Sequence, residues 1–410
     1  PVTLDDPGEI DAALAEAEVV ISNGNMLHDY PQLADLEVPW VVDAYVPTPS
    51  EALAANRHRD PGERLAGHRV DTRTVNRFLA RADLVLCASE RQRDLYLGIL
   101  ASLGRLNPYV YDADPTLRAL IDVVPYGLPA EPPRHTHDVL RGVLPGVGPE
   151  DKVLLWGGGI WNWFDPLTLI EALEIVVGRR DDVRLCFPGT RHPYAARIPD
   201  MEMRARAAEL ADARGLAGRH VFFGQWAPYD ERPNYLLEAD IGVSLHPAGI
   251  EAHFSFRTRM LDYIWAGLPM VVTEGDVFAE WVREDGLGYV VAPGDVSGVA
   301  EAILSLLDEA DARAARADAF SRRAAGLRWA QVAEQLVAFC RDPHPAPDRA
   351  AGYLPEPLDE AAEIRRELDA ARAREEALEM LVDGYRTGRL MRALEALQGL
   401  RRRIGPRGDG

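Results

Sequence analysis

Cysteine is scarce in this chain and occurs in no pattern typical of a disulfide framework or a zinc site. The 410 residues include three cysteines, Cys87, Cys186 and Cys340, which lie far apart in the sequence. Cys87 and Cys186 lie within apolar runs, where a free thiol packs as a small hydrophobic side chain. An odd number of scattered cysteines is typical of a reducing compartment, so the sequence predicts a cytoplasmic protein.

The chain also lacks a secretory signal pattern, and it has no apolar run of the roughly 20 residues that a membrane-spanning helix needs. Basic residues are in the minority, because 45 lysines and arginines stand against 65 aspartates and glutamates, a net charge of −20. Nucleic acid backbones attract basic surfaces, so this balance argues against a nucleic acid partner. Hydrophobic residues make up 47% of the chain, which is enough for buried cores in two domains.

Strand-like and helix-like segments alternate along most of the chain, which predicts parallel, doubly wound α/β sheets. Strands are predicted at residues 18–23, 38–45, 83–88, 121–124, 152–156, 183–188, 220–224, 241–245, 270–272 and 288–292. Helices are predicted at residues 69–82, 90–103, 165–177, 201–214, 233–239, 260–265 and 296–308. A stretch rich in proline and glycine, residues 129–148, interrupts the alternation.

This interruption predicts four parts. Residues 1–130 form a first α/β domain, residues 131–149 a linker, and residues 150–342 a second α/β domain. Residues 343–410 form a further linker and a helical tail.

The most informative segment, residues 239–273, reads as a strand, a polar loop, a helix and a buried strand. The loop carries His246, Glu251, His253 and Arg257, and Gly267 stands where a helix C-cap glycine is expected. Charged groups thus follow the carboxyl end of a parallel strand, where open α/β sheets bind ligands. An ordinary strand–helix–strand unit with a solvated loop is the alternative.

The end of this segment, LDYIWAGLPMVVT, resembles the donor-sugar signature of GT-B glycosyltransferases of the retaining family-4 type. The resemblance extends to ADLVLCASERQRDLYLGIL and IDVVPYGLP, and it covers about residues 15–340. It implies a GT-B fold, in which two Rossmann-like, doubly wound parallel-sheet domains face each other across a cleft. The family's first strand and glycine-rich loop are expected to precede Pro1.

The resemblance also assigns donor-site residues. The carboxylate that binds the ribose hydroxyls in the family corresponds to Asp262, which is one methylene shorter. Eight residues earlier the family has a glutamate that contacts the sugar, but this chain has Phe254. Glu251 and His253 are the nearest replacements. With Arg257 they form the predicted catalytic set.

Groups for a diphosphate are expected beside this helix. Gly157, Gly158 and Gly159 follow a strand and precede a helix, where bare backbone and a helix N-terminus favour an anion. The family usually has a basic residue at this point, whereas this stretch has none. Arg257 and Arg259 are therefore the predicted diphosphate ligands, and a solvated surface arginine is the alternative.

Tryptophans surround the glycine run. Trp161 or Trp163 is predicted to line the cleft, with Trp161 as the donor-site residue, whereas Trp156 ends a strand and is the least favoured of the three. Asn162 is predicted to add a polar contact to the donor. Core packing is the alternative for the aromatic residues.

Two further loops are assigned by the resemblance alone. Gln225 and Trp226 stand at the family position where a strand end meets the nucleotide base. The loop of Glu274 and Gly275 corresponds to one that approaches the sugar.

On the acceptor side, Asn25 and His28 follow the first predicted strand, and Asp43 ends the next. They are predicted to face the cleft from the first domain. The alternative is simple turn chemistry, because Asn-Gly is itself a turn signal.

Motifs for covalent or metal-dependent hydrolysis are absent, including the serine nucleophile elbow and HExxH. No DxD-like metal pair lies in the expected cleft loops. The resemblance implies a retaining, metal-independent transfer in which electrostatic stabilisation of the leaving diphosphate dominates. We therefore expect no cofactor, with a nucleotide-diphosphate sugar as co-substrate.

The tail differs from the acidic body. Between Arg386 and Arg407 it holds seven arginines against the single acidic residue Glu395, with leucines near helical spacing. A basic amphipathic helix of this kind suits an anionic membrane surface. Docking on the acidic body or on a partner protein is an equal alternative.

The sequence thus predicts a glycosyltransferase that moves a sugar from a nucleotide donor to a hydroxyl acceptor, which is a glycan, a lipid-linked molecule or a natural product. A sugar-nucleotide epimerase and a noncatalytic GT-B scaffold remain as alternatives. An epimerase needs acid and base carboxylates around the sugar, and only Glu251 is an obvious candidate.

Overall fold

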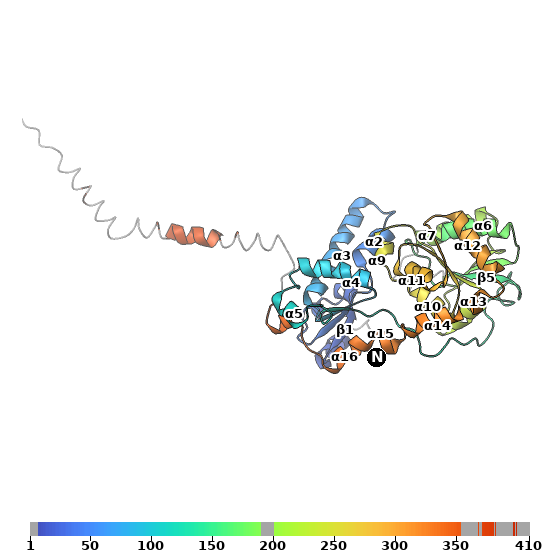
Figure 1. Cartoon of the computed structure of the whole chain (residues 1–410). Coiled ribbons are helices and arrows are strands. Elements are labelled where there is room, and N and C mark those ends of the chain that lie inside the picture. Colours follow the sequence, from blue (N-terminus) through green and yellow to red (C-terminus); the bar gives the residue numbers. More distant parts are fainter. Residues whose placement is uncertain are drawn as a thin grey trace, which may run out of the picture. The chain divides into compact units, whose positions relative to one another are not determined.

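Two parallel sheets flanked by helices confirm the predicted pair of Rossmann-like domains (Figure 1). The computed structural model describes residues 7–189, 201–353, 368, 371–380, 382, 397 and 399. The chain divides into one unit of Pro1–Pro355 and another of Glu356–Gly410, and both sheets belong to the first unit.

The first domain has four parallel strands in the order β1-β2-β3-β4. The strands are β1 (Val20–Asn23), β2 (Trp40–Asp43), β3 (Leu84–Cys87) and β4 (Ile121–Val123). The helices are α1 (Pro7–Glu16), α2 (Thr48–Ala55), α3 (Pro61–Arg81), α4 (Glu90–Ser102) and α5 (Pro108–Ala113), with the 3₁₀ helices η1 (Gly24–His28) and η2 (Pro31–Asp35). Each strand lies within its predicted range, because short runs of buried aliphatic residues mark strands of a parallel sheet.

The second domain has six parallel strands in the order β10-β9-β8-β5-β6-β7. The strands are β5 (Lys152–Leu155), β6 (Val183–Phe187), β7 (Val221–Phe223), β8 (Ile241–Ser244), β9 (Met270–Thr273) and β10 (Gly288–Val291). The helices are α6 (Pro166–Val177), α7 (Glu202–Ala213), η3 (Tyr229–Glu231), α8 (Arg232–Glu238), α9 (Ile250–Phe254), α10 (Thr258–Ala266), α11 (Val277–Asp285), α12 (Val296–Asp308), α13 (Ala312–Ala315) and α14 (Ala317–Ala325).

Helix caps fix several boundaries that the sequence predicts. Ser89 caps α4 by accepting a hydrogen bond from the Gln92 amide, as expected for a serine before a helix. Gly267 ends α10 with a φ of 62°, a left-handed conformation that glycine adopts without strain. The next strand, β9, can therefore begin three residues later.

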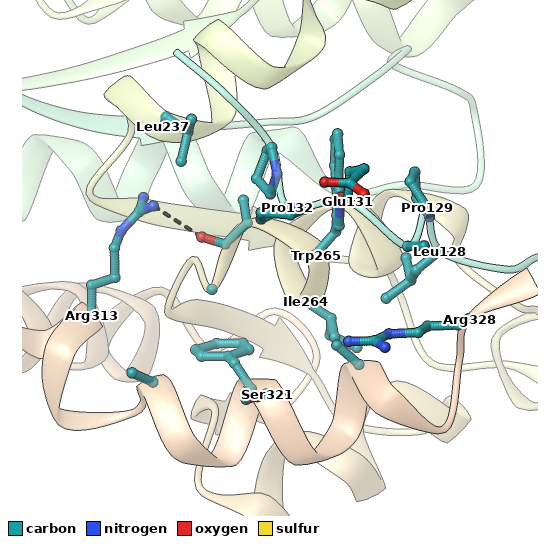
Figure 2. A pocket seen from close by; sticks show the side chains of 17 residues that line it. Leu128, Pro129, Glu131, Pro132, Leu237, Ile264, Trp265, Arg313, Ser321 and Arg328 are labelled. Carbon is teal, nitrogen blue, oxygen red and sulfur yellow. Dashed lines mark hydrogen bonds between the residues drawn. The ribbon is translucent and has the colours of Figure 1, made fainter.

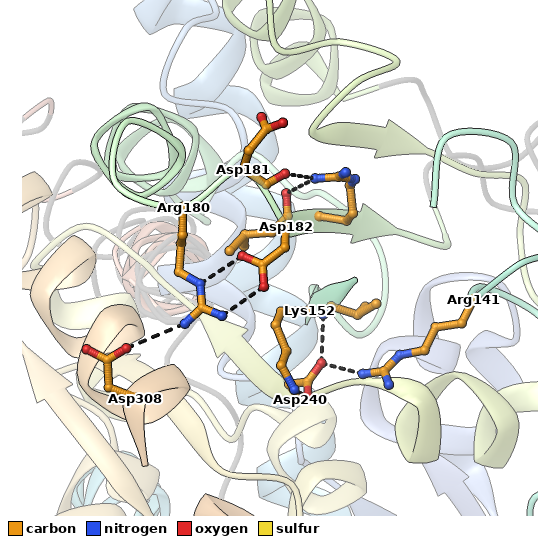
Figure 3. Close-up of polar contacts among 10 residues, drawn as sticks. Arg141, Lys152, Arg180, Asp181, Asp182, Asp240 and Asp308 are labelled. Atoms are coloured by element: carbon orange, nitrogen blue, oxygen red, sulfur yellow. Dashed lines mark hydrogen bonds and ion pairs between the residues drawn. The ribbon is translucent and has the colours of Figure 1, made fainter. Parts of the chain in front are cut away.

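Ion pairs hold the amino-terminal edge of the second sheet (Figure 3). Asp240, just before β8, forms ion pairs with Arg141 and with the Lys152 ammonium, the latter at 3.3 Å. Its carboxylate also accepts the Val153 amide at 2.8 Å. Arg180 pairs with Asp182, just before β6. The opposite, carboxyl-terminal edge therefore remains for ligands.

The chain returns to the first domain after α14, through α15 (Trp329–Val332), α16 (Glu334–Arg341) and α17 (Pro347–Ala350). Phe339 of α16 packs with core residues of the first sheet. Asp348 of α17 and Arg105 are both fully buried and form an ion pair at 2.8 Å. The predicted limit of the second domain, at residue 342, falls between these two helices.

In the second unit, residues 371–380 are helical and exposed. The predicted basic helix, from Arg386 to Arg407, lies outside the described residues except for positions 397 and 399. Among the described residues, no helix combines the length and the apolar composition needed to cross a bilayer.

Candidate functional site

A cavity of about 290 Å³ lies between the two domains. Tyr45, Pro47 and Glu51 line it from the first domain. From the second domain it is lined by the glycine run after β5, by aromatic side chains and by the start of α10. Nine residues that the sequence singled out for the cleft meet there: Gly157, Gly158, Gly159, Trp161, Trp163, Trp226, Arg257, Arg259 and Asp262.

Two buried arginines at the start of α10 give the cavity its positive charge. Arg257 is 5% exposed, and its Nη2 donates to Glu251 Oε2 at 2.7 Å, while its Nε has no partner among the described residues. Arg259 is 8% exposed and donates from Nη2 to the Gly159 carbonyl at 2.9 Å. Its Nη1 likewise has no partner among the residues that the structure describes.

Arg259 is held by aromatic faces rather than by a carboxylate. Its guanidinium lies 4.0 Å from the ring centroid of Phe164 and 4.7 Å from that of Trp156. Burial lowers the pKa of Arg259 to about 10, so it stays protonated at neutral pH. A buried cation with an unused donor is costly unless an anion occupies the space beside it. The cavity therefore favours an anionic ligand.

The helix that presents these arginines adds its own partial charge. No side chain caps the N-terminus of α10, and Arg257, Thr258 and Arg259 at this end line the cavity. The free first amides and the positive end of the helix dipole therefore lie beside it. The sequence predicted this role for the N-terminus of α6. There, however, Asp165 accepts from the Thr168 amide at 3.0 Å and from its hydroxyl at 2.6 Å. That helix end is already capped by a carboxylate.

The glycine run follows a path that a side chain would disturb. Gly158 has a φ of 116°, which L-residues rarely adopt. The Gly157 amide donates to the Tyr263 hydroxyl at 2.7 Å, and the Gly159 carbonyl is bound by Arg259. Tyr263 and Arg259 both belong to α10, so the run is fixed to the helix that carries the arginines.

Asp262 lies on the same helix and lines the cavity, as predicted. Its nearest cation is Arg232 of α8, whose Nη1 lies 3.2 Å from Asp262 Oδ1. Burial raises the pKa of Asp262 to about 6, against the opposing charge of Arg232. The side chain is therefore an ionised hydrogen-bond acceptor at neutral pH.

Aromatic side chains form one wall of the cavity. The rings of Trp161 and Trp163 stack with their centroids 5.5 Å apart and their planes 5° apart. Trp226 adds a half-exposed ring from the loop after β7. Trp156, the least favoured of the three in the sequence analysis, is fully buried in the core. Such a wall suits the flat faces of a nucleobase or a sugar.

Several predicted residues hold the site without lining the cavity. Glu251 is buried and binds both Arg257 and the Ser255 hydroxyl. Asn162 bridges the domains, because its amide donates to the Ala55 carbonyl at 2.9 Å while its oxygen accepts the Met203 amide.

Arg91 of the first domain contacts both His253 and the loop that follows β9. Arg91 donates to the carbonyls of His253 and Gly275, the latter at 2.7 Å. Glu274 pairs loosely with Arg283 at 3.7 Å. Gln225 is exposed and lies outside the cavity lining.

The three predicted acceptor-side residues lie near the cleft end of the first sheet but do not line the cavity. Asn25 and His28 are exposed in η1, and the Asn25 side chain accepts from Thr48. Asp43 accepts from the Tyr45 amide, and burial raises the pKa of its carboxyl.

Sequence reasoning missed the first-domain residues that do line the cavity. Tyr45 donates from its hydroxyl to the Phe256 carbonyl at 2.7 Å. Glu51 lies in the first turn of α2. A proline at the helix start, in TPSE, is the only local signal, and it marks a helix rather than a site. The loop after β8 was also expected to lack a helix, whereas residues 250–254 form α9.

A buried glutamine joins the two domains behind the cavity. Gln92 of α4 donates to the Tyr45 carbonyl and to the Phe254 carbonyl, both at 2.8 Å. Helix α9 packs against α2 and α4 of the first domain (Figure 1). The arginines of α10 are thereby placed against the first domain.

A larger cavity, of about 570 Å³, lies elsewhere, between residues 128–133, the end of α10 and α14 (Figure 2). Arg313 points into this region, where it donates to the Ala266 carbonyl at 3.0 Å. The Arg313 guanidinium also donates to the Leu236 and Ala239 carbonyls, so its hydrogen bonds are made with the backbone. This cavity is away from the carboxyl ends of the strands, so it is a weaker ligand-site candidate.

One group among the described residues could hold a metal ion. His135, Asp138 and Glu238 bring their ligand atoms within 4.8 Å of one another. Glu238 already accepts the amides of Val139, Leu140 and Arg141. None of the three lines the cleft cavity.

Comparison with known proteins matches the second domain to a family model. Residues 151–309 match the model of glycosyl transferases group 1. A phosphatidyl-myo-inositol mannosyltransferase of Mycolicibacterium smegmatis is 27% identical over 147 residues, 35% of this chain. Its Mycobacterium leprae counterpart is 25% identical over 170 residues, 42% of the chain. The matches span 37% and 41% of those relatives' lengths.

Solved structures share the arrangement of both domains. Sucrose-phosphate synthase from Thermosynechococcus elongatus is similar with a TM-score of 0.55 at 19% identity, over 82% of this chain and 76% of that one. The Anabaena protein HepE in complex with UDP-glucose gives a TM-score of 0.59 at 15% identity, over 81% and 82%. These similarities show that the fold is GT-B.

Proposed function

We propose that this chain, a GT-B glycosyltransferase by its fold and by the family model that matches its second domain, transfers a sugar from a nucleotide-diphosphate donor to a hydroxyl acceptor. The observation that carries the proposal is the pair of Arg257 and Arg259. Both guanidinium groups are buried beside the cleft cavity, and each keeps a nitrogen without a partner among the described residues. A diphosphate supplies the charge and the acceptor oxygens that such groups need.

The other cavity residues suit the rest of a nucleotide sugar. Asp262 is an ionised acceptor one turn along α10 from the arginines, where ribose hydroxyls can donate to it. Trp161, Trp163 and Trp226 offer apolar faces for the base or the sugar. Glu251 acts as a positioning residue, because it fixes the Arg257 side chain.

The proposed transfer is retaining and metal-independent. The acceptor oxygen bonds to the anomeric carbon on the face that the diphosphate leaves, and the electron pair of the broken bond stays on the diphosphate. The acceptor proton passes to the leaving phosphate oxygen. The two arginines and the N-terminus of α10 stabilise the negative charge that develops there, which lowers the barrier.

The names of similar proteins guide the choice of substrates. HepE is in complex with UDP-glucose, so UDP-glucose is the first donor to test. The mannosyltransferases carry phosphatidyl-myo-inositol in their names, which supports testing polyol and lipid-linked acceptors.

Donor turnover without an acceptor tests the proposal. We expect slow release of UDP from UDP-glucose, or of the matching diphosphate from another nucleotide sugar, with glucose or its counterpart as the product. The release is lost in Arg259→Gln. A changed sugar still attached to the nucleotide would identify an epimerase. A folded protein that neither binds nor turns over any nucleotide sugar would favour the noncatalytic scaffold.

The tail supports a second, separate proposal about location. Its arginine-rich residues 386–407 suit the surface of an anionic membrane. We expect the full chain to sediment with phosphatidylglycerol vesicles at low salt, and a chain ending at residue 385 to stay in solution. Equal sedimentation of the two chains would contradict the proposal, and binding of neutral phosphatidylcholine vesicles is the control.

A further inference from the structure

The first domain presents to the cavity one carboxylate that makes no hydrogen bond or ion pair with the described residues. Tyr45, Pro47 and Glu51 are its three lining residues. The Tyr45 hydroxyl donates to the Phe256 carbonyl, and Pro47 has no polar side-chain atom. Glu51 is thus the group with which the first domain can recognise a polar ligand in this space.

The surroundings of Glu51 leave its charge largely uncompensated. Glu51 lines the same cavity as Arg257, and α2 packs against α9, the helix that carries Glu251. The Arg257 Nη2 is bonded to Glu251 at 2.7 Å, so this cation is shared with a second carboxylate. Arg257 is 5% exposed, and its Nε has no partner among the described residues. The space between the domains is therefore lined by a buried polar group that is available to a ligand.

We propose, resting on the function proposed above, that Glu51 is the specificity-determining residue for the acceptor. It accepts a hydrogen bond from a hydroxyl of an uncharged sugar or polyol, and it disfavours an acceptor that carries a negative charge next to the reacting hydroxyl.

The division of charge across the cavity supports this role. Arg259 and the N-terminus of α10 favour the donor diphosphate on one side. Glu51 lies on α2 of the opposite domain, and Glu251 lies close enough to repel it. Ionised carboxylates only accept hydrogen bonds, so they pair with hydroxyl donors and repel carboxylates and phosphates. An acceptor held between the two domains meets this acidic side.

The protonation of Glu51 gives the role a pH signature. Burial, reinforced by Glu251 and opposed by Arg257, raises the pKa of Glu51 to about 7. Among the described residues, Tyr45 and Tyr96 also interact with Glu51, and both stay neutral because burial raises the pKa of each hydroxyl. As pH falls below about 7, Glu51 becomes a neutral acid and a weaker acceptor. The acceptor KM should therefore rise.

Transfer to a matched panel of acceptors tests the proposal. The full chain is supplied with the nucleotide sugar that it hydrolyses and with methyl glucoside, glucosamine or glucuronic acid, which are neutral, cationic and anionic. We expect transfer to methyl glucoside and glucosamine, and at least fivefold lower kcat/KM for glucuronic acid. Glu51→Gln should raise the KM for methyl glucoside at least fivefold, remove the discrimination against glucuronic acid and flatten the pH profile of the acceptor KM.

Controls separate this proposal from the function on which it rests. Glu51→Gln should not weaken donor binding or slow acceptor-free donor hydrolysis, because it removes a negative charge from the cavity that also holds Arg257 and Arg259. Glu51→Asp should restore part of the acceptor affinity. Glu63→Gln, an exposed glutamate of the same domain, should change nothing.

Several results would overturn the assignment of Glu51. They are an unchanged acceptor KM in Glu51→Gln, an equal loss of donor affinity, or a wild type that hydrolyses its donor but transfers to none of the panel. A wild type that does not bind a nucleotide sugar would instead overturn the function itself.

Discussion

At the scale of single residues, burial shifts the pKa values of charged side chains around the cleft, which their sequence context does not reveal. Asp262 is an example, because burial raises its pKa to about 6 although Arg232 lies 3.2 Å away. Keeping Asp262 ionised at neutral pH therefore costs desolvation free energy. Perturbed groups of this kind are common at ligand-binding sites. Ribose hydroxyls that donate to it would offset that cost.

Asp262→Ala should weaken UDP-glucose binding about tenfold or more, because the lost hydrogen bonds to a charged group are worth roughly 1.5–3 kcal/mol. In the wild type, affinity should also fall as pH drops below about 6, where Asp262 becomes protonated. UDP-glucose calorimetry between pH 5 and 8 measures both effects. Asp212→Ala, an exposed aspartate of α7, is the control. Wild-type affinity in the folded Asp262→Ala variant would contradict the role.

Glu51 carries a matching prediction about stability. Its folded-state pKa of about 7 lies above its usual 4.5, so the native protein binds more protons between those pH values. The free energy of unfolding therefore falls as pH rises through that window, and the loss persists above it. Glu51→Gln should raise Tm at pH 8 by about 2–4 °C, a gain of ~1 kcal/mol. It should leave Tm unchanged near pH 4. A lower Tm at pH 8 would contradict the uncompensated charge.

The reach of sequence reasoning also differs from residue to residue. Arg257 and Arg259 could be predicted because they stand beside a helix whose pattern LDYIWAGLP resembles a known signature. Glu51 could not be, since nothing in TPSEALAA tells which face of α2 lies against the other domain. That face is fixed by contacts of α2 with α9, about 200 residues away in the chain.

At the scale of elements, α9 and the start of α10 are held by the first domain. Arg91 contacts the carbonyls of His253 and Gly275 and pairs with Glu280 of α11. Gln92 fixes the Phe254 carbonyl from the same helix. The α9 and β9 loops of the second domain are thus ordered by polar contacts from α4 of the first domain.

Arg91→Ala should lower kcat/KM for donor turnover roughly three- to tenfold, because the contacts that order the α9 and β9 loops are each worth about 1 kcal/mol. Its Tm should stay within about 2 °C of the wild type, since the side chain is partly solvated. Steady-state kinetics and a thermal melt measure the two quantities. Arg219→Ala, which removes an exposed pair with Asp181 at 2.9 Å, is the matched control. Equal kinetics of the two variants would show that the Arg91 contacts do not order the site.

Elements also show why strands were easier to predict than connections. The buried runs of β3 and β9, LVLC and MVVT, are recognisable because both faces of a parallel strand are covered. Helix α9, five residues long, follows Gly249 and lacks a hydrophobic period of its own. It exists because Glu251 pairs with Arg257 and because α2 and α4 pack against it.

At the scale of the whole molecule, the chain crosses between the domains twice. After the second domain, α16 and α17 return to the first, where Asp348 pairs with Arg105 at 2.8 Å and accepts from Asn107 at 2.9 Å. Asp83 accepts the Ala346 amide and pairs with Arg349. The pairing of Arg105 with Asp348 joins residues 243 positions apart, which local sequence patterns do not reveal.

Ending the chain at residue 342, the limit predicted from sequence, should therefore destabilise the first domain. Arg105 would be a fully buried cation without its carboxylate, a loss of roughly 3–5 kcal/mol. A chain that ends at residue 353 should keep the wild-type Tm, whereas the shorter chain should melt at least about 6 °C lower. Asp348→Ala should reproduce the effect, and exposed Asp342→Ala should not. Equal melting of the two truncated chains would contradict this account.

Calorimetry of UDP, GDP, dTDP, ADP and CMP binding to the wild type and to Arg259→Gln tests the central claim most directly. Arg259 is buried beside the cavity, and its Nη1 has no partner in the part of the chain that the structure describes. This arrangement predicts selective binding of one diphosphate. The variant should weaken that binding at least tenfold, since a charged hydrogen bond contributes roughly 1.5–3 kcal/mol. Exposed Arg206→Gln should bind like the wild type. Binding of no nucleotide, or equal affinity in Arg259→Gln, would contradict a nucleotide-diphosphate site at the start of α10.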